Sequence, residues 1–578
     1  MPKRQFPVVS PALLALLALA GCGGGSNGTA PPGACGAAAL DLAIGQPHTV
    51  TGECASEIAI VAGAGGAQYV AVAFREDPSG GSSVLDLQVV GLNFDLVASN
   101  AIGDAPSLQE SVLESADIHG ARPWAASPDH PFHMQLRARE RREFSPQSHP
   151  RQALAASPSG GISGGARLAI TSVDPQVGDL VTINAQARSA CSNPIDRPGR
   201  IAAVSQRAVV VHDTENPADG FTDADYQSIA AAFDTLIHPV AALNFGTPSD
   251  IDGNGRSVIF YTREVNLLTE AGSGSFVGGF FFVRDLFPKT GDNPCPTSNE
   301  GELFYMLVPD PTGIHGNKWD RETVLRLTLG TIAHEYQHLI NSSRRLFVNF
   351  APIWEDVWLD EGLAHVAEEL TFYRSAGLSP RTNIDLPRIT GDAVVLNAFN
   401  RFMISNVGRL EDYLKTPHGN SPYSNTDGLG TRGAAWSFLR YAADRRGSSE
   451  QPFWMGLVNS QTAGLTNLQN ALGTAPLPWF RDWATSTYLD DAIGSAPAQY
   501  ISPSWNMRSI FTHEVLGGGY PLPVHVLSSG QTHSRGLVAG GASYARLSIG
   551  PGGNATIEFS AAGTAPPPAI SVTLVRTQ

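Results

Sequence analysis

Hydrophobic residues recur every three or four positions in the segment after Asp320, and this spacing predicts an amphipathic helix packed on one side. The residues with this spacing are Val324, Leu327, Thr331 and Ile332. Asp320 is a suitable N-cap, and the acidic Glu322 falls in the first turn, where the helix dipole favours it. Gly330 costs about 1 kcal/mol relative to alanine inside a helix, so we expect another backbone to approach closely there.

Alternating hydrophobic and polar residues predict short strands near both ends of the sequence. The predicted strands are 57–61 and 68–74 in one region and 544–549 and 570–575 in the other. Glycine-rich turns separate these strands, which is typical of β-sandwiches. We therefore expect two flanking β-sandwich-like domains, an N-terminal one over residues 33–105 and a C-terminal one over residues 500–578.

The region between the flanking domains mixes both periodicities, which predicts a multidomain α+β chain. The elements that indicate this are strands at 180–184, 208–212 and 303–308, and helices at 223–237, 393–407 and 433–441. Their order favours an α+β domain over residues 166–390, followed by a helical subdomain over residues 391–499.

Residues 106–165 differ from both neighbouring regions. A charged run at 137–143 precedes a proline-, serine- and glycine-rich stretch at 157–161, and this composition predicts a linker or a pro-segment. The arginines of the charged run also suit a processing site. We adopt the simpler interpretation of a solvated helix or linker.

Composition narrows the class of partner. Charged residues make up 16% of the chain, the formal net charge is −15, and no long basic surface stands out. We therefore expect no nucleic-acid partner. The acidic balance favours solubility and indicates no particular substrate.

The first residues predict export. Two basic residues precede an apolar run over 8–20, which is short for a bilayer span and ends in Leu-Ala-Gly-Cys at Cys22. This ending resembles the lipobox of bacterial lipoproteins, and it implies a signal peptide over 1–21, a lipid anchor at Cys22 and a flexible tether over 22–32. Gly23 gives no inner-membrane retention signal, so an outer-membrane destination is expected in a Gram-negative cell. Plain secretion is the alternative.

Four further cysteines form an even set, which suits a disulfide-bonded exported protein. Three pairings are possible. The most economical joins Cys35 to Cys54 and Cys191 to Cys295, because each pair then lies within one predicted domain. Since no two of these cysteines have C-x-x-C spacing, a cysteine zinc site is not expected.

The predicted helix carries the sequence His334-Glu335-Tyr336-Gln337-His338. Two histidines four positions apart lie on one helical face, where both imidazoles can bind one Zn²⁺. The adjacent glutamate is then placed to take a proton from a metal-bound water. The alternative is an ordinary helix with two surface histidines. A catalytic zinc also needs a third protein ligand.

Glu361 is the predicted third ligand. It falls 23 positions after His338 in a second predicted helix, far enough for a turn and a returning helix. The segment Trp-Leu-Asp-Glu-Gly-Leu-Ala at 358–364 resembles the one that carries the glutamate ligand in gluzincin metallopeptidases. The neighbourhood resembles the hyicolysin family of bacterial metallopeptidases, also through residues 278–287 and 298–305. The resemblance extends over residues 166–490 and is specific around the two zinc segments.

This resemblance implies a gluzincin catalytic domain that hydrolyses peptide bonds. Zinc lowers the pKa of its bound water, and Glu335 would accept the proton as general base and pass it to the leaving amine. The resemblance also implies an oxyanion donor in the helical half. Tyr423 is our candidate for that donor, and His418 and Tyr441 are the alternatives. The strand at 303–308 would edge the cleft and pair with an extended substrate.

Other residues of the second helix are candidates for supporting roles. His365 lies one turn beyond Glu361, where it could bind zinc, orient a ligand or have no role. The acids with the same supporting potential are Asp356, Asp360, Glu368 and Glu369. The segment 339–345 lacks the glycine and histidine that a metzincin would place there, which argues against that class.

Asp250, Asp252 and Asn254 resemble half of a calcium loop, because alternating oxygen ligands beside a turn-forming glycine suit Ca²⁺. Tyr261 stands where an EF-hand would have its glutamate, so this segment is not an EF-hand. The alternative is an Asx/Gly turn between a helix and a strand.

Together these patterns predict an exported zinc endopeptidase that acts on protein or peptide substrates. One alternative is an aminopeptidase on the same fold, in which Glu300 or Glu302 would bind the substrate amine. A second alternative is a non-catalytic, surface-binding lipoprotein. The intact set of predicted ligands and base argues against this second alternative.

Overall fold

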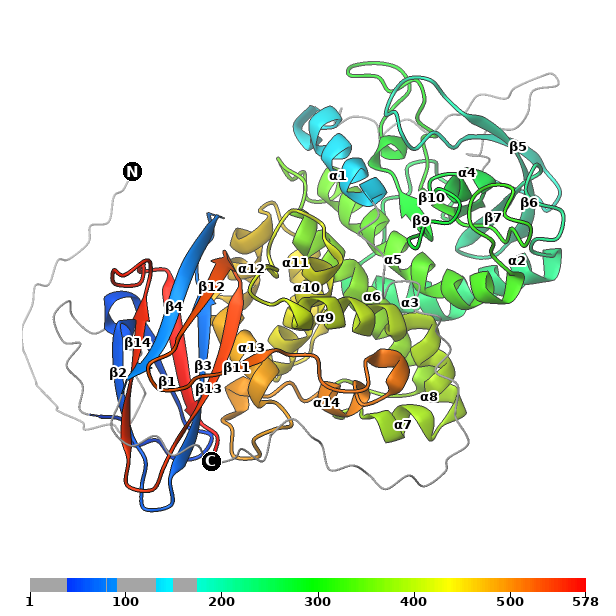
Figure 1. The fold of residues 1–578 in the computed structure, drawn as a ribbon. Coiled ribbons are helices and arrows are strands. Elements are labelled where there is room, and N and C mark those ends of the chain that lie inside the picture. The colour runs from blue at the N-terminus through cyan, green and yellow to red at the C-terminus, as the bar shows by residue number, and fades with distance from the viewer. Residues whose placement is uncertain (1–38, 80, 91–130, 149–173) are drawn as a thin grey trace, which may run out of the picture. The chain divides into compact units, whose positions relative to one another are not determined.

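The computed structural model of the chain describes residues 39–79, 81–90, 131–148 and 174–578. The predicted signal peptide, Cys22, the tether and Cys35 lie outside these ranges, so the anchor and the Cys35–Cys54 pair stay predictions. In the described part, the strands form three sheets (Figure 1).

Two of these sheets form a β-sandwich from strands of both ends of the chain. The five-stranded sheet has the order β1-β15-β3-β13-β11, and the four-stranded sheet has the order β12-β4-β14-β2. The strands are β1 (Pro47–Thr51), β2 (Glu57–Val61), β3 (Ala67–Arg75), β4 (Ser82–Val90), β11 (Val524–Val526), β12 (Thr532–Val538), β13 (Ala542–Ile549), β14 (Asn554–Ser560) and β15 (Ile570–Arg576). Figure 1 shows the blue N-terminal strands between the red and orange C-terminal ones.

The structure therefore differs from the two separate β domains that we expected over 33–105 and 500–578. Strand β3 pairs antiparallel with both β13 and β15, and β4 pairs with β12 and β14. A sheet built only from the N-terminal strands would leave their edges unpaired. The C-terminal strands satisfy those edges, so one sandwich replaces two.

Strand β3 is buried along its whole length because it faces two cores. Alternate side chains of a strand point to opposite faces. Tyr69 and Ala71 join the core between the two sheets, whereas Val70 and Val72 join the main core of the molecule. Helix α13 (Leu477–Leu489) packs against this second face, where the hydroxyl of Tyr544 donates to the carbonyl of Ala484 at 2.7 Å.

The third sheet is mixed and has the order β5-β6-β7-β8-β10-β9. Its strands are β5 (Leu180–Asn184), β6 (Asp196–Val204), β7 (Ala208–Asp213), β8 (Ser257–Tyr261), β9 (Gly279–Phe281) and β10 (Leu303–Met306). Strands β7, β8 and β10 are parallel, and β9 pairs antiparallel with β10. The predicted strand at 303–308 is thus internal, and the expectation that it edges a cleft is wrong. That edge belongs to β9.

Helices pack against this sheet and make up the other main elements of the described chain. They are α1 (Pro131–Glu143), α2 (Asp223–Ala232), α3 (His238–Phe245), α4 (Arg263–Asn266), α5 (Arg321–Phe347), α6 (Val357–Ala376), α7 (Leu386–Thr390), α8 (Ala393–Ala398), α9 (Ile404–Lys415), α10 (Leu429–Arg446), α11 (Gln451–Val458), α12 (Gly464–Leu472), α13 and α14 (Met507–Ile510). The π-helical turns η4 (Phe233–Ile237) and η6 (Phe399–Met403) interrupt two helical stretches. The stretch Asp223–Phe245 is long and apolar enough to span a membrane by length and composition, but its buried side chains join the main core.

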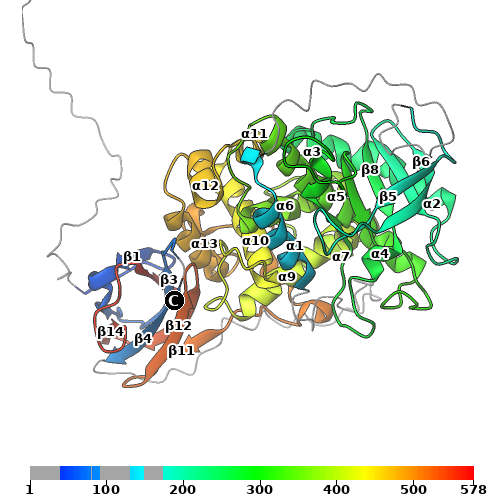
Figure 2. The ribbon, with the colours of Figure 1, turned by 90° about the horizontal axis from the view of Figure 1, so that it is seen from above.

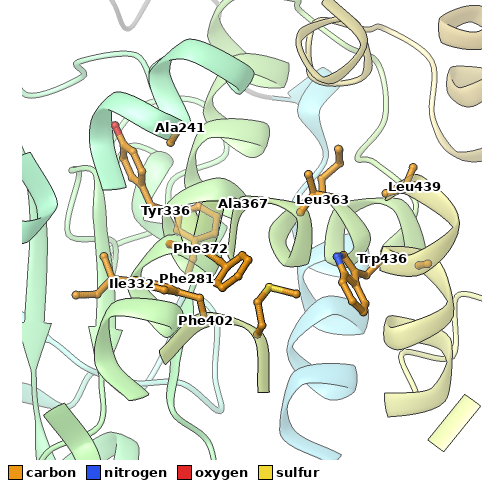
Figure 3. Close-up of a cluster of buried hydrophobic side chains, with 14 of the residues drawn as sticks. Ala241, Phe281, Ile332, Tyr336, Leu363, Ala367, Phe372, Phe402, Trp436 and Leu439 are labelled. Carbon is orange, nitrogen blue, oxygen red and sulfur yellow. The ribbon is translucent and has the colours of Figure 1, made fainter. Parts of the chain in front are cut away.

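The main core surrounds α5 and α6. Figure 3 shows Ile332 and Tyr336 of α5 beside Ala367 and Phe372 of α6, with Phe402 of η6 next to them. Trp436 and Leu439 of α10 approach the other side of α6. These contacts fix α5 and α6 against one another, which positions the residues of the candidate site.

Helix α1 overturns our interpretation of the charged run as a solvated helix or linker. The run is helical, but Arg137 and Glu140 are buried. Phe132, Leu136 and Glu140 follow one another at a spacing of four residues and are buried, and Phe144, just after the helix, is buried as well. In the view of Figure 2, α1 lies in front of α6, and its Arg137 reaches Glu361 of that helix. The predicted disulfide between Cys191 and Cys295 is confirmed.

Candidate metal centre

Helix α5 begins as its sequence predicts. The side chain of Asp320 accepts the backbone hydrogen of Thr323 at 2.8 Å, which makes it the N-cap. At Gly330, a β-carbon would lie 2.6 Å from the carbonyl oxygen of Arg401, so the close backbone that we expected belongs to η6. This contact fixes α5 one turn before His334.

The two histidines of α5 and Glu361 of α6 converge on one point. The Nε2 atoms of His334 and His338 lie 3.1 Å apart. The Glu361 carboxylate reaches both, with Oε2 at 3.2 Å from His334 Nε2 and Oε1 at 3.6 Å from His338 Nε2. All three side chains are buried. The predicted ligands therefore lie together, although 23 positions separate the second histidine from the glutamate.

These residues fit a zinc ion. Two nitrogens that bind one tetrahedral zinc at about 2.0–2.1 Å lie about 3.3–3.4 Å apart, close to the separation between the two imidazoles. Neither oxygen of Glu361 makes a hydrogen bond of good geometry with any described residue. Its oxygens instead face charged or chargeable groups, among them the Arg432 guanidinium at 3.0 Å. The donor set of two imidazoles and one carboxylate is one that zinc prefers.

Two further carboxylates hold the imidazoles. The Nδ1 atom of His334 lies 2.8 Å from Glu368 Oε1, and the Nδ1 atom of His338 lies 2.9 Å from Asp360 Oδ2. Such contacts at Nδ1 leave Nε2 to face a metal. Of the four acids that we considered for this role, Asp360 and Glu368 take it. Asp356 precedes α6 as its N-cap residue, and Glu369 binds Arg440 and Trp505.

The carboxylates also determine how the imidazoles titrate. Burial disfavours a charged imidazole, but the carboxylates outweigh burial: Glu361 and Glu368 raise the pKa of His334, and Asp360 raises the pKa of His338 to about 10. An imidazole binds a metal only when it is neutral, so metal binding at this site is coupled to proton release.

His365 is an additional potential ligand. One nitrogen of His365 lies within 4.8 Å of ligand atoms of His334 and Glu361. Its Nδ1 atom lies 2.8 Å from Glu368 Oε1, and burial, with the nearby Arg409, lowers its pKa to about 3. We keep His338 as the predicted ligand, because its Nε2 atom lies 3.1 Å from that of His334 and 3.6 Å from Glu361 Oε1, and because it completes the H-E-x-x-H spacing.

Two arginines that the sequence analysis did not single out approach Glu361. Arg432 of α10 places Nη1 3.0 Å from Glu361 Oε2 and also binds Asp427 through two nitrogens. Arg137 of α1 places Nε 3.6 Å from Glu361 Oε1. Burial favours the neutral carboxyl, but Arg432 and the histidines outweigh it and hold the pKa of Glu361 well below its usual range. The four-residue spacing of Phe132 and Leu136 was a signal that α1 has a buried face.

The predicted base, Glu335, is buried beside the edge strand. Its Oε2 atom accepts the backbone hydrogen of Phe281, the last residue of β9, at 2.8 Å. This hydrogen bond ties α5 to the edge of the mixed sheet.

The predicted oxyanion donor lies elsewhere. Tyr423 donates from its hydroxyl to the carbonyls of Arg75 and Asp77, at 3.3 and 3.1 Å, in the contact with the β-sandwich. Tyr441 donates to the carbonyl of Gln499. The carbonyl of the third candidate, His418, accepts from the backbone of Val538. None of these contacts involves the histidine cluster, so the assignment of Tyr423 is withdrawn.

The second predicted metal site has a different composition from the one expected. Asn254 donates from Nδ2 to Asp252 at 2.7 Å, and its Oδ1 atom accepts from the backbone of Arg256, so its amide oxygen is already used. Glu302 lies with Asp250 and Asp252 instead. Since Glu300 is half-exposed beside Lys289, neither glutamate of the aminopeptidase alternative contacts the histidine cluster.

The fold and this geometry define a buried candidate metal centre of two histidines and one glutamate on two packed helices. No family model matches the chain. A stretch of 155 residues is 34% identical to the neutral metalloprotease ShpI of Staphylococcus hyicus. That stretch makes up 26% of this chain and 32% of the relative, so the chain spans about a third of the length of the protein that it matches.

Proposed function

We propose that this chain is a zinc-dependent endopeptidase of the gluzincin type. The observation that carries the proposal is the convergence of His334, His338 and Glu361 next to Glu335, with carboxylates holding both imidazoles. The segment similar to a neutral metalloprotease supports a peptidase. Protein or peptide substrates follow from that activity.

His334, His338 and Glu361 would hold the zinc ion, which supplies a Lewis acid and lowers the pKa of a water molecule. Glu335 then serves as the general base. The Phe281 backbone hydrogen fixes its Oε2 atom, which leaves Oε1 to take a proton and return it to the leaving amine. Arg432 keeps Glu361 ionised and therefore able to bind a cation.

The N-terminal sequence supports export of this enzyme, with Cys22 as the site of a lipid anchor. Mass spectrometry of the protein from its native cell would test this. A diacylated peptide that begins at Cys22 is expected, whereas an unmodified peptide there would indicate plain secretion.

Metal content and hydrolysis of an internally quenched peptide, blocked at both ends, test the function. We expect stoichiometric zinc and a chelator-sensitive activity in the parent chain. Glu335→Gln should keep the zinc and lose about 10²–10⁴-fold in kcat, the usual contribution of a general base. Glu322→Gln is the matched control, because this exposed residue lies in the first turn of the same helix.

Absence of zinc from the purified parent chain would overturn the proposal and favour the non-catalytic alternative. Zinc with activity only on peptides with a free amino terminus would favour an aminopeptidase. The two glutamates on which that alternative rested make other contacts: Glu302 lies in the acidic cluster and Glu300 pairs with Lys289.

A further inference from the structure

Three carboxylates outside the zinc site gather where two strands of the mixed sheet begin. Asp250 and Asp252 lie in the loop that leads into β8, and Glu302 immediately precedes β10. One oxygen from each of the three lies within 4.8 Å of the others. Asp250 is exposed, but Asp252 and Glu302 are only 8% and 2% exposed.

In the described part of the chain, no lysine or arginine forms an ion pair with any of the three carboxylates, although Arg207 and Arg256 line the cavity beside them. Glu302 Oε2 is buried and has no hydrogen-bond partner among the described residues. Like charges that are buried together without a counter-charge are strongly unfavourable. Either these groups hold protons or a cation belongs between them.

Neighbouring backbone groups fix the carboxylates in place. Glu302 Oε1 accepts from the backbone of Ile251 at 2.5 Å, and Asp250 Oδ2 accepts from the backbone of Gly255 at 3.1 Å. These contacts use one oxygen of Glu302 and one of Asp250, whereas both oxygens of Asp252 accept from Asn254. The second oxygen of Glu302 is left inside the cluster without a donor.

A cavity of about 190 Å³ adjoins the cluster and is lined by Asp250, Glu302 and Tyr336 among others. Arg256 also lines it, but its guanidinium donates to the carbonyls of Ser205 and Asn254 rather than to the carboxylates. The cavity has room for the water molecules that complete the coordination shell of a hard cation.

We propose that Asp250, Asp252 and Glu302 form a binding site for a divalent cation of the calcium class. All three supply carboxylate oxygens, which are the ligands that Ca²⁺ prefers, and water would complete a shell of six to eight. This ligand set differs from the sequence-based one, because Glu302 takes the place of Asn254. It is also independent of the zinc site, with which it shares no residue.

The cation would connect two neighbouring parallel strands. The loop with Asp250 and Asp252 enters β8, and the carbonyl of Glu302 accepts from the backbone of Val258 in β8 at 2.7 Å. Strand β10 in turn pairs with β9, whose Phe281 holds Glu335. The site would therefore stabilise the sheet that supports the zinc helix.

Calcium titration by calorimetry, into the full chain after exhaustive dialysis against calcium-free buffer that contains zinc, tests this proposal. We expect saturable binding of one calcium ion per chain, weaker binding of Mg²⁺, and a rise of the thermal unfolding midpoint with calcium concentration. Glu302→Gln should weaken calcium binding about tenfold or more while zinc content is unchanged. Glu300→Gln, a half-exposed glutamate two positions away that pairs with Lys289, is the matched control and should bind as the parent does.

Calcium binding that is absent from the parent, or equal in the parent and Glu302→Gln, would overturn the proposal. If Glu302→Gln fails to fold, Asp250→Asn provides the same test at an exposed position. Both readouts are independent of peptidase activity, so a failed zinc assignment would not affect them.

Discussion

At the scale of single residues, Asp360 and Glu368 act on the candidate zinc site through the histidines that they contact. Each carboxylate places an oxygen beside the Nδ1 atom of a histidine. This contact orients the imidazole so that its Nε2 atom faces the candidate metal site. Glu368 Oε1 contacts both His334 and His365, whereas Asp360 faces His338. The two carboxylates are thus not equivalent. Asp360 is the better one to substitute, because it contacts a single histidine.

Asp360→Asn should weaken zinc binding about 10–100-fold, because the amide supports the imidazole of His338 less well than a carboxylate does. Competition with a chromophoric chelator measures this. The same preparation should keep the circular dichroism of the parent chain. Asp356→Asn is the control, since Asp356 makes no side-chain cap hydrogen bond at the start of the same helix. Equal losses in both variants would contradict a specific role for Asp360.

Helical spacing predicted the two histidines and their shared face, because that geometry is local. It could not choose among four acids of α6, since the choice depends on how α6 is rotated against α5. The contact of Arg432 with Glu361 was not predicted for a related reason. It reaches Glu361 from a helix 71 positions later, and nothing in its local sequence marks it as different from a surface arginine. The role predicted for Tyr423 is not supported by its contacts, because the local sequence around a loop tyrosine does not indicate which group its hydroxyl will bind.

At the scale of elements, Gly330 explains how α5 and η6 approach one another. The carbonyl of Arg401 occupies the space that a side chain at position 330 would need. Gly330→Ala should therefore destabilise the protein by about 1–3 kcal/mol through overpacking, although alanine is the better helix former. Chemical denaturation followed by circular dichroism measures this difference.

Gly456→Ala offers the matched comparison inside another helix, α11. Nothing lies within 4 Å of a β-carbon built there, so this substitution should stabilise the protein by about 0.5–1 kcal/mol. We expect Gly330→Ala to lower the free energy of unfolding and Gly456→Ala to raise it. Stabilisation in both would mean that η6 moves away at little cost.

For the strands too, the sequence predicted an element from its own residues but not its neighbours in the sheet. Strand β10 was predicted because its residues are continuously apolar, and the structure places it over Leu303–Met306. Its neighbours in the sheet were not predictable, because the three residues of β9 give too short a pattern to recognise. The edge strand was therefore assigned to the wrong segment.

At the scale of the whole molecule, the two ends of the chain share one sandwich. Leu574 of β15 is fully buried between the sheets. Leu574→Ala should cost about 2–5 kcal/mol of stability. Hydrogen exchange measured by mass spectrometry should then show faster exchange in β1 and β3, both of which pair with β15.

Val526→Ala is the control for this variant, because Val526 lies on the edge strand β11 and is 51% exposed. Exposed substitutions of this kind change stability by about 0.5 kcal/mol or less. Faster exchange confined to residues after 500 in Leu574→Ala would contradict a shared sandwich and support two separate β domains.

The shared sandwich has a consequence for the time course of synthesis. Arg75 donates to the carbonyl of Leu537, 462 positions later, so the N-terminal strands leave the ribosome long before their partners exist. At about 5–20 residues per second, that delay is about 20–90 s. During this interval β3 has no strand on either edge, and such edges attract other chains. We therefore expect the nascent chain to depend on a holding chaperone until its last strand, β15, has been made.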